Sequence, residues 1–270
     1  VGLFVIEQTP DPEFVASITQ VEGTATWFDT TGTGPAAAGT SVNTGDVIAT
    51  GAGRMLVRFP DGASIRIDQH SSVRVESRSE LVLESGAVYV DSGGDADRIP
   101  SDLTFLAEGR RITHLGTQYE IRRAEGVLEV AVREGSVAVS GGNDVTGGTP
   151  GWVASATDNT GEALVFAATG DVRRQSITRY NGRWGWINEV SPGFEMVGHS
   201  YAEYVDWVAR EQGLSVSWGS RDALEKADVV PAMADGDSFA PVPDQLEQIL
   251  ATAGLTAFRA EGVLEVRVAE

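Results

Sequence analysis

The feature that most constrains this chain is a succession of short alternating segments between residues 20 and 140. Met55, Val57 and Phe59 are apolar residues at alternate positions, as expected of a strand with one buried face. Pro60-Asp61-Gly62 then predicts a turn in which glycine supplies the positive φ, and Ile65 and Ile67 resume the alternation. The same pattern recurs at short spacings, and no helical periodicity interrupts it. We therefore predict a mostly β fold, a stacked β-sandwich or β-coil rather than an α/β sheet.

The octapeptide RAEGVLEV occurs twice, at Arg123–Val130 and at Arg259–Val266. In each copy, Glu-Gly separates two segments of alternating apolar residues, a pattern typical of a β-hairpin with a tight turn. We expect each copy to form such a hairpin for local structural reasons, without a shared function. A functional repeat is the alternative.

Towards the C-terminus the pattern changes from strands to helices. Ser200 and Glu203 have the spacing of a capping box, in which the two residues satisfy backbone amides at a helix start. Gly213 predicts the end of this helix, because glycine readily enters the left-handed conformation. The unit occurs again: Pro243 suits a first helical turn, and Gly254 ends the second helix before an alternating strand.

These two helix–Gly–Leu units predict a small split βαβ domain built from two similar halves. Its other strands are expected near Phe194–Val197 and Val229–Met233. Trp184 and Trp186 lie between the β region and this domain. Tryptophan is used as a core anchor or as an interface hot spot, and we favour core or inter-domain packing, for which this location is suited to fix the two regions relative to each other. The glycine-rich stretch 140–151 is expected to be a surface connection.

Composition narrows the function. The 270 residues carry a formal net charge of −19, whereas nucleic-acid binding and anionic membrane surfaces call for a basic face. The chain has no cysteine, which excludes disulfides, thiolate nucleophiles and thiolate metal sites. No segment reaches the ~20 apolar residues that span a bilayer.

Motifs for catalysis or metal binding are not found. His70, His114 and His199 are far apart in sequence, have polar or loop-like settings and are expected to be surface or hydrogen-bonded residues. No nucleophile motif singles out a serine. We therefore expect no enzyme, no metal site and no cofactor.

One acidic segment leaves an alternative open. Asp91, Asp95 and Asp97 loosely resemble a calcium loop, but the ligand order of such loops is missing. An acidic solvated loop is the favoured interpretation.

An ordered set of short motifs runs from Val21 to Ser140. In chain order they are Gly45-Asp46, Thr50-Gly51, Phe59 with Asp61-Gly62, Ser71, Gly86, Leu115-Gly116-Thr117 and Glu134-Gly135-Ser136-Val137. In this order they resemble the FecR domain, with Ala63 where serine is commoner in the family. From about Phe194 onward the chain is similar to the short N-terminal domain shared by secretins and TonB-dependent receptors.

The resemblance implies a periplasmic region anchored to the inner membrane by an upstream helix outside this chain. It also implies a signal relay that binds the signalling domain of a TonB-dependent outer-membrane receptor. Such a relay regulates an extracytoplasmic-function sigma factor through a cytoplasmic segment absent from this chain. We accordingly predict a juxtamembrane segment at 1–19, whose Val1–Ile6 are nearly all apolar, and a FecR-like β domain at 20–140. A connection and packing segment at 141–190 and a βαβ domain at 191–270 follow.

The predicted partner-binding site lies on two short apolar strands of the C-terminal domain, because an exposed strand edge can accept a strand from a partner. Its residues are Leu214, Val216, Trp218, Val229, Val230 and Met233. Two alternatives stay open. The protein could be an envelope glycan-binding or structural assembly module without a sigma-factor role, or an enzyme with paired carboxylates on a β scaffold.

Overall fold

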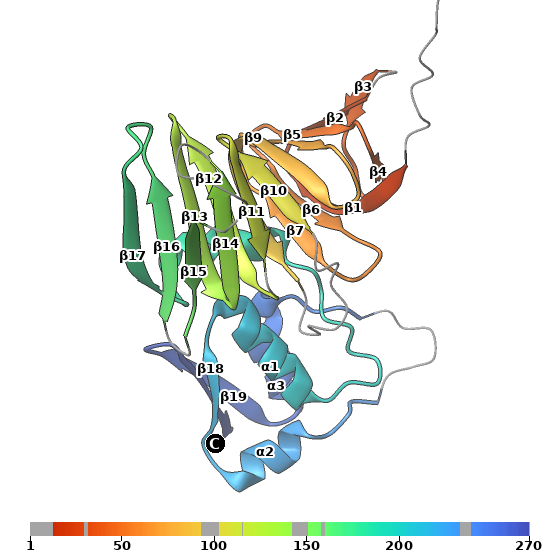
Figure 1. Cartoon of the computed structure of the whole chain (residues 1–270). Coiled ribbons are helices and arrows are strands. Elements are labelled where there is room, and N and C mark those ends of the chain that lie inside the picture. The colour runs from red at the N-terminus through yellow and green to blue at the C-terminus, as the bar shows by residue number, and fades with distance from the viewer. Residues whose placement is uncertain are drawn as a thin grey trace, which may run out of the picture.

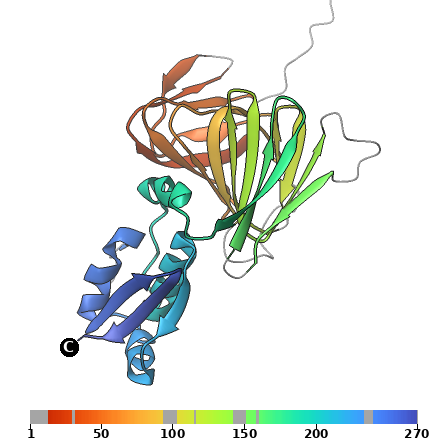
Figure 2. The same ribbon diagram turned by 90° about the vertical axis from the view of Figure 1, so that its left-hand side faces the viewer.

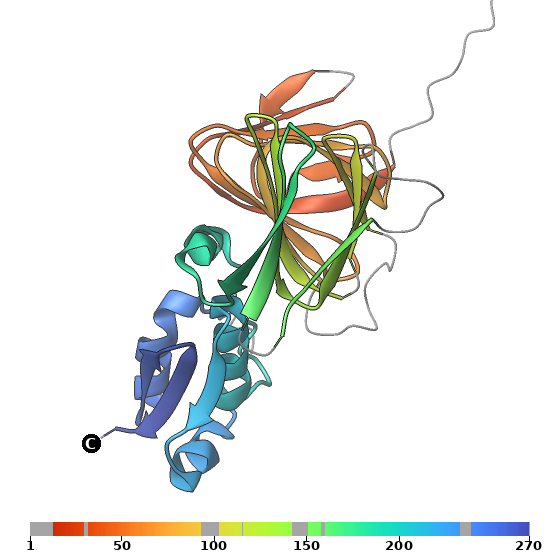
Figure 3. The same cartoon turned by 60° about the vertical axis from the view of Figure 1, so that its left-hand side comes forward.

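The computed structural model describes residues 13–29, 32–92, 103–114, 116–141, 151–157, 160–232 and 239–269. Figure 1 shows a large β-sandwich with a smaller α+β domain at one end of its strands, and Figures 2 and 3 show the same two parts from other sides. The predicted mostly β fold with a small α+β C-terminal region is confirmed. No helix in the described ranges is both long and apolar enough to cross a membrane.

Seventeen strands in the described residues form the sandwich. They are β1 (Phe14–Glu22), β2 (Ala25–Phe28), β3 (Thr33–Pro35), β4 (Ser41–Asn43), β5 (Val47–Thr50), β6 (Arg54–Arg58), β7 (Ser64–Ile67), β8 (Ser72–Val75), β9 (Glu80–Asp91), β10 (Thr104–Ala107), β11 (Arg110–His114), β12 (Gln118–Ala124), β13 (Val127–Glu134), β14 (Ser136–Gly141), β15 (Trp152–Ser155), β16 (Thr160–Phe166) and β17 (Val172–Thr178).

Hydrogen-bonded neighbours arrange these strands in two layers that share β9. Sheet A has the order β4-β1-β6-β7-β9-β12-β13-β16-β17, and sheet B the order β3-β2-β5-β8-β9-β10-β11-β14-β15. Strand β9 passes from one layer to the other at Gly86, which has φ +83°. A Cβ there would lie 2.1 Å from the Ser71 Oγ, so both the conformation and the contact require glycine.

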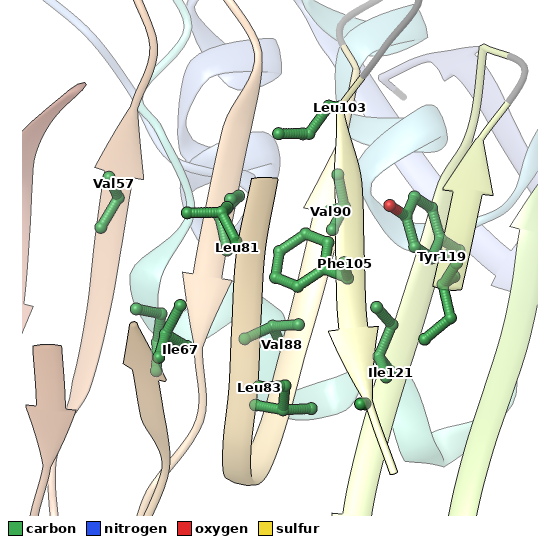
Figure 4. Close-up of a cluster of buried hydrophobic side chains, with 14 of the residues drawn as sticks. Val57, Ile67, Leu81, Leu83, Val88, Val90, Leu103, Phe105, Tyr119 and Ile121 are labelled. Carbon is green, nitrogen blue, oxygen red and sulfur yellow. The ribbon is translucent and has the colours of Figure 1, made fainter. Parts of the chain in front are cut away.

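The core lies between the layers and is built from the alternating apolar residues of both sheets. Figure 4 shows part of it, where Ile67, Val88 and Ile121 of sheet A meet Leu81 and Phe105 of sheet B. All five are buried. Alternation thus places one face of each strand in the core, as the sequence pattern predicts.

The repeated octapeptide forms the same hairpin in both places. Its turn residues have positive φ in each copy, 51° and 75° at Glu125-Gly126 and 47° and 85° at Glu261-Gly262. Two positive φ values in a two-residue loop match the twist of the flanking strands, which explains the Glu-Gly pair. The hairpin prediction is confirmed for both copies.

A 3₁₀ segment, η3 (Gly182–Val190), leads from the sandwich into the C-terminal domain. The domain consists of α1 (Tyr201–Gln212), β18 (Ser215–Trp218), α2 (Arg221–Ala227), η4 (Pro243–Gln245), α3 (Leu246–Thr252), β19 (Leu255–Ala260) and β20 (Val263–Val268). The capping box at Ser200 and Glu203 is present, and Gly213 ends α1 with φ 68°. The strand order of the small sheet is β18-β20-β19.

Two predicted strands of this domain are wrong. Among the described residues, the backbone around Phe194 makes two hydrogen bonds to another extended segment, from Phe194 and Met196 to the carbonyls of Pro241 and Phe239. Val229 and Val230 follow helix α2, which begins after its N-cap Ser220 and was not predicted, and they belong to no strand. Met233 lies outside the described residues.

Strands also occupy segments expected to be less regular. The sandwich begins with β1 inside the predicted segment 1–19, and β15, β16 and β17 lie within the predicted connection 141–190. Val1–Ile6 and most of the stretch 140–151 lie outside the described residues. Among the histidines, His70 and His199 are at the surface, whereas His114 is buried in β11 and stacks on Tyr119.

Candidate partner-binding surface and its connection to the β domain

The outer face of sheet A carries polar side chains that are buried. Arg66, Tyr89 and Glu120 lie side by side across β7, β9 and β12, and each is at most 1% exposed. Asp91 and Gln118 form the neighbouring row. Buried polar groups require partners, and here the partners come from the segments that cover this face.

The C-terminal end of helix α1 is one of these covering segments. The Glu211 carboxylate accepts a hydrogen bond from Arg66 Nη2 at 2.6 Å, and both side chains are 1% exposed. The hydroxyl of Ser191 also donates to this carboxylate, at 3.3 Å. Burial would lower the pKa of Arg66, but Glu211, Tyr89 and Asp91 outweigh it and raise the pKa, so Arg66 is charged.

Arg210, the preceding residue of α1, forms a second ion pair with the same face. Its two Nη atoms each donate to a carboxylate oxygen of Asp91 at 2.9 Å, a bidentate geometry. Gln118 donates to the same carboxylate at 3.0 Å. Burial would raise the pKa of Asp91, but Arg210, Arg66 and Gln118 hold it below its ordinary value.

Arg133 of β13 completes the contact. Its Nη1 donates to the main-chain carbonyl of Glu211 at 2.8 Å, and its Nε donates to that of Arg179 at 2.7 Å. A cation at the carbonyl end of a helix is favourable because of the helix dipole. We call Arg66, Asp91, Arg133, Arg210 and Glu211 the junction, since these residues join the C-terminal domain to sheet A.

Segment η3 covers a neighbouring part of the outer face, over β13 and β16 (Figure 2). Trp184, Trp186 and Ile187 pack on the small residues of β13 and β16. The Glu120 carboxylate accepts from the Trp186 Nε1 at 3.1 Å and from the guanidinium of Arg183. The packing role predicted for the two tryptophans is confirmed, because both are buried between η3 and the sheet.

Strand β18 contains two of the predicted binding residues and lies at an edge of the small sheet. The N–H groups of Ser215 and Gly219 donate to the carbonyls of Gly262, just before β20, and of Val266 in β20, at 2.9 and 2.8 Å. Because backbone direction alternates along a strand, the N–H and C=O groups of Val216 and Trp218 point away from β20. No strand in the described part of the chain pairs with that side.

The other predicted binding residues lie elsewhere. Val229 and Val230 are 54% and 50% exposed and line a groove of about 500 Å³ with Tyr201 and Lys226. Leu214 borders a different groove, between the hairpin β19–β20 and η3. The structure therefore brings Val216 and Trp218 together and separates them from the valine pair.

The acidic residues considered for calcium do not form a metal site in the described residues. Asp91 pairs with Arg210, while Asp95 and Asp97 lie outside those residues. No group of three or more histidine, aspartate or glutamate side chains placed to hold a metal ion occurs in the part of the chain that the structure describes.

Sequence reasoning missed the junction. On strands with one buried face, residues such as Arg66 and Asp91 fall at alternate positions and are expected to face water. The available signal was the density of charged and amide side chains on the outward positions of β7, β9 and β12. Arg210 and Glu211, at the end of a predicted helix, carry charges opposite to those of Asp91 and Arg66.

Part of the β region matches a known protein family. Residues 46–138 match the family model described as FecR protein. The FecR resemblance predicted for the β region is therefore confirmed over these residues. No curated protein matches the sequence.

Two solved structures also resemble the chain. Both are crystal structures of a "putative anti-sigma factor" from Parabacteroides distasonis ATCC 8503, at 2.50 and 1.65 Å resolution. Each is 14% identical to this chain, covers 83% of it over 99% of its own length, and has a TM-score of 0.39. The likeness in fold is loose.

Proposed function

We propose that this chain is the periplasmic signal-relay module of a FecR-like regulator anchored in the inner membrane. Its C-terminal domain binds the signalling domain of a TonB-dependent outer-membrane receptor. The FecR domain passes the binding event on towards an extracytoplasmic-function sigma factor, through a cytoplasmic segment outside this chain. The FecR domain at residues 46–138 supports the regulatory class.

The observation that carries the proposal is the position of the open strand edge directly after the junction. Only Gln212, Gly213 and Leu214 separate the buried Glu211 from β18. A partner that orders or shifts β18 therefore acts on the end of α1, where Arg66 and Arg133 are bound. The same few residues present a binding edge and hold the two domains together.

The binding mode follows from the geometry of β18. A strand of the partner adds beside it and exchanges hydrogen bonds with the outward N–H and C=O groups of Val216 and Trp218. The Val216 and Trp218 side chains pack against the helices of the domain, so they hold the edge in place. Recognition rests on main-chain bonds, with specificity supplied by the partner's alternating side chains.

Substitution of one edge residue separates main-chain from side-chain binding. Val216→Pro removes the outward N–H and is compatible with an edge strand, whereas Val216→Ala keeps this N–H. We expect Val216→Pro to weaken binding about fivefold, because one hydrogen bond contributes roughly 1 kcal/mol. Val216→Ala keeps the hydrogen bond, so its dissociation constant should stay within about threefold of the wild-type value, a change in binding free energy of about 0.6 kcal/mol. The measurement is calorimetry with the purified signalling domain of a TonB-dependent receptor encoded beside this gene.

Two outcomes count against this assignment. Equal affinity of the Val216→Pro variant and the wild type, with thermal melts showing both folded, excludes the β18 edge. Loss of binding in a Val229→Ser/Val230→Ser variant alone would place the site in the groove beside Lys226. No binding by the wild-type chain would contradict the proposed partner itself.

A further inference from the structure

Strand β17 forms an end of sheet A and has an open side. It pairs with β16 in an unbroken antiparallel register, from Phe166 opposite Val172 to Thr160 opposite Thr178. No described strand pairs with its other side, which lies at the left of Figure 1. At the C-terminal end of β17, the Thr178 carbonyl accepts from the Asn181 N–H and the Trp184 Nε1. Every β17 side chain is exposed or half-exposed.

Most features that protect sheet edges are missing from β17. The strands at the other ends of the two layers have three residues (β3 and β4) or four (β15), and β3 includes Pro35. Short strands, prolines and bulges discourage edge pairing. Strand β17 has seven residues, with no proline, glycine or bulge.

One of its two arginines does not present its charge along the edge. The Arg174 guanidinium donates to a carboxylate oxygen of Glu162 at 2.7 Å and to the carbonyl of Val153 at 2.9 Å. It also lies over the ring of Trp152. Arg173 is therefore the residue whose charge a pairing strand has to accommodate.

The turn before β17 fixes which backbone groups point outwards. Ala167 donates to the carbonyl of Asp171 and accepts from the N–H of Gly170, both at 2.9 Å, which is the pattern of a glycine bulge. Alternation from this point directs the N–H groups of Val172, Arg174, Ser176 and Thr178 away from β16. These N–H groups form the donor row of the open edge.

The open edge is complementary to itself, because Arg174 and Ser176 each present a carbonyl beside the outward N–H. In an antiparallel pair with a two-fold axis at Gln175, Arg174 of one copy lies opposite Ser176 of the second copy, and both have outward backbone groups. Arg173 then faces Ile177, so no like charges are opposed. Moving the axis to Arg174 would place that residue opposite its own copy, which is less favourable.

We infer that β17 pairs with β17 of a second copy of this chain, joining two A sheets into one continuous sheet across a two-fold axis. Such an interface uses the same surface on both copies and is closed after two. It is remote in sequence from β18 and does not depend on the proposed receptor partner. Because it joins a single strand edge from each copy, the dimer is expected to depend on concentration.

A cysteine substitution tests the register directly, because the chain contains no cysteine. In this arrangement the two copies of residue 175 form a non-hydrogen-bonded pair with Cα atoms about 4.5 Å apart, which a disulfide can bridge. Gln175→Cys should give a disulfide-linked dimer on mild oxidation. Arg173→Cys is the matched control, since its two copies would be about 13 Å apart along the strands. Equal cross-linking of both variants, or none in either, overturns the proposal.

Sedimentation of the cysteine-free protein gives an independent test. The wild type should increase in mean mass with concentration. Ser176→Pro, which removes an outward N–H, should remain monomeric, whereas Ser176→Ala should behave as the wild type. Thermal melts establish that both variants are folded. A wild type that is monomeric at every concentration contradicts the inferred dimer.

Discussion

The two halves of the C-terminal domain share a local pattern but differ in what they contact. Both contain a helix, a glycine in the left-handed conformation, a leucine and a strand, with φ 68° at Gly213 and 66° at Gly254. Arg210-Glu211-Gln212 precedes the first glycine, and Ala251-Thr252-Ala253 precedes the second. Only the first triplet has charged side chains, and it is the one that reaches sheet A.

This difference indicates that local folding and docking on sheet A depend on different residues. The glycine and leucine of each unit end a helix and start a strand, which is a local requirement. Docking depends on two charged residues at the helix end and on a sheet face that offers opposite charges. The first half thereby combines a junction with an open edge, whereas the second half serves the domain's own core through Leu250 and Leu255.

The largest effect is expected when one partner of the buried Arg66–Glu211 ion pair is removed. Arg66→Met leaves the Glu211 carboxylate buried without its cation and should lower the free energy of unfolding by roughly 3–5 kcal/mol. The counterpart in the second half is Arg259, whose pair with Glu247 is largely exposed. Arg259→Met should cost less than about 1 kcal/mol. Urea unfolding followed by tryptophan fluorescence measures both.

A double variant shows whether charge or shape holds the junction. Arg66→Met/Glu211→Leu replaces the pair with apolar side chains and should recover most of the stability lost in Arg66→Met. Equal destabilisation by Arg66→Met and Arg259→Met would contradict the conclusion that the buried contact with sheet A belongs to the first half.

The two helix-ending glycines provide the next comparison. Gly254→Ala should cost about 1–2 kcal/mol, because alanine is strained in the left-handed conformation and the site is otherwise open. At Gly213 a Cβ would also lie 2.1 Å from the carbonyl oxygen of Arg179 and 2.6 Å from Arg133 Nε. Gly213→Ala should therefore cost roughly 2–4 kcal/mol, strain and overpacking together. Thermal melts of the two variants, compared at equal concentration, give the difference; a larger loss at Gly254 would be inconsistent with the junction.

The features that could be predicted from the sequence are those that depend on residues close together in the chain. The capping box of α1, both helix-ending glycines and the two RAEGVLEV hairpins each involve residues close in the chain, whose conformations are restricted by local chemistry. The FecR resemblance likewise rested on turn residues in a fixed order.

The junction could not be predicted from the sequence, because it joins residues far apart in the chain. Arg66 and Glu211 meet across 145 residues, and the alternation of β7 makes Arg66 indistinguishable from a solvent-facing arginine. The missed helix α2 has a local cause: its seven residues are too few for a clear apolar face. The valines that follow it then resemble a strand.

The smallest expected effect is the pH dependence of the second ion pair, whose attraction is offset in part by burial of both groups. Arg210 and its neighbours hold the pKa of Asp91 below the ordinary value of 3.8. The pair therefore contributes stability that is fully present above this value and lost as the pH falls through the lowered pKa. Asp91→Asn cannot ionise, so the stability difference between wild type and variant should shrink between about pH 5 and pH 2. Urea midpoints across this range measure it, and a difference that stays constant with pH would show that the Asp91 charge does not hold α1 to sheet A.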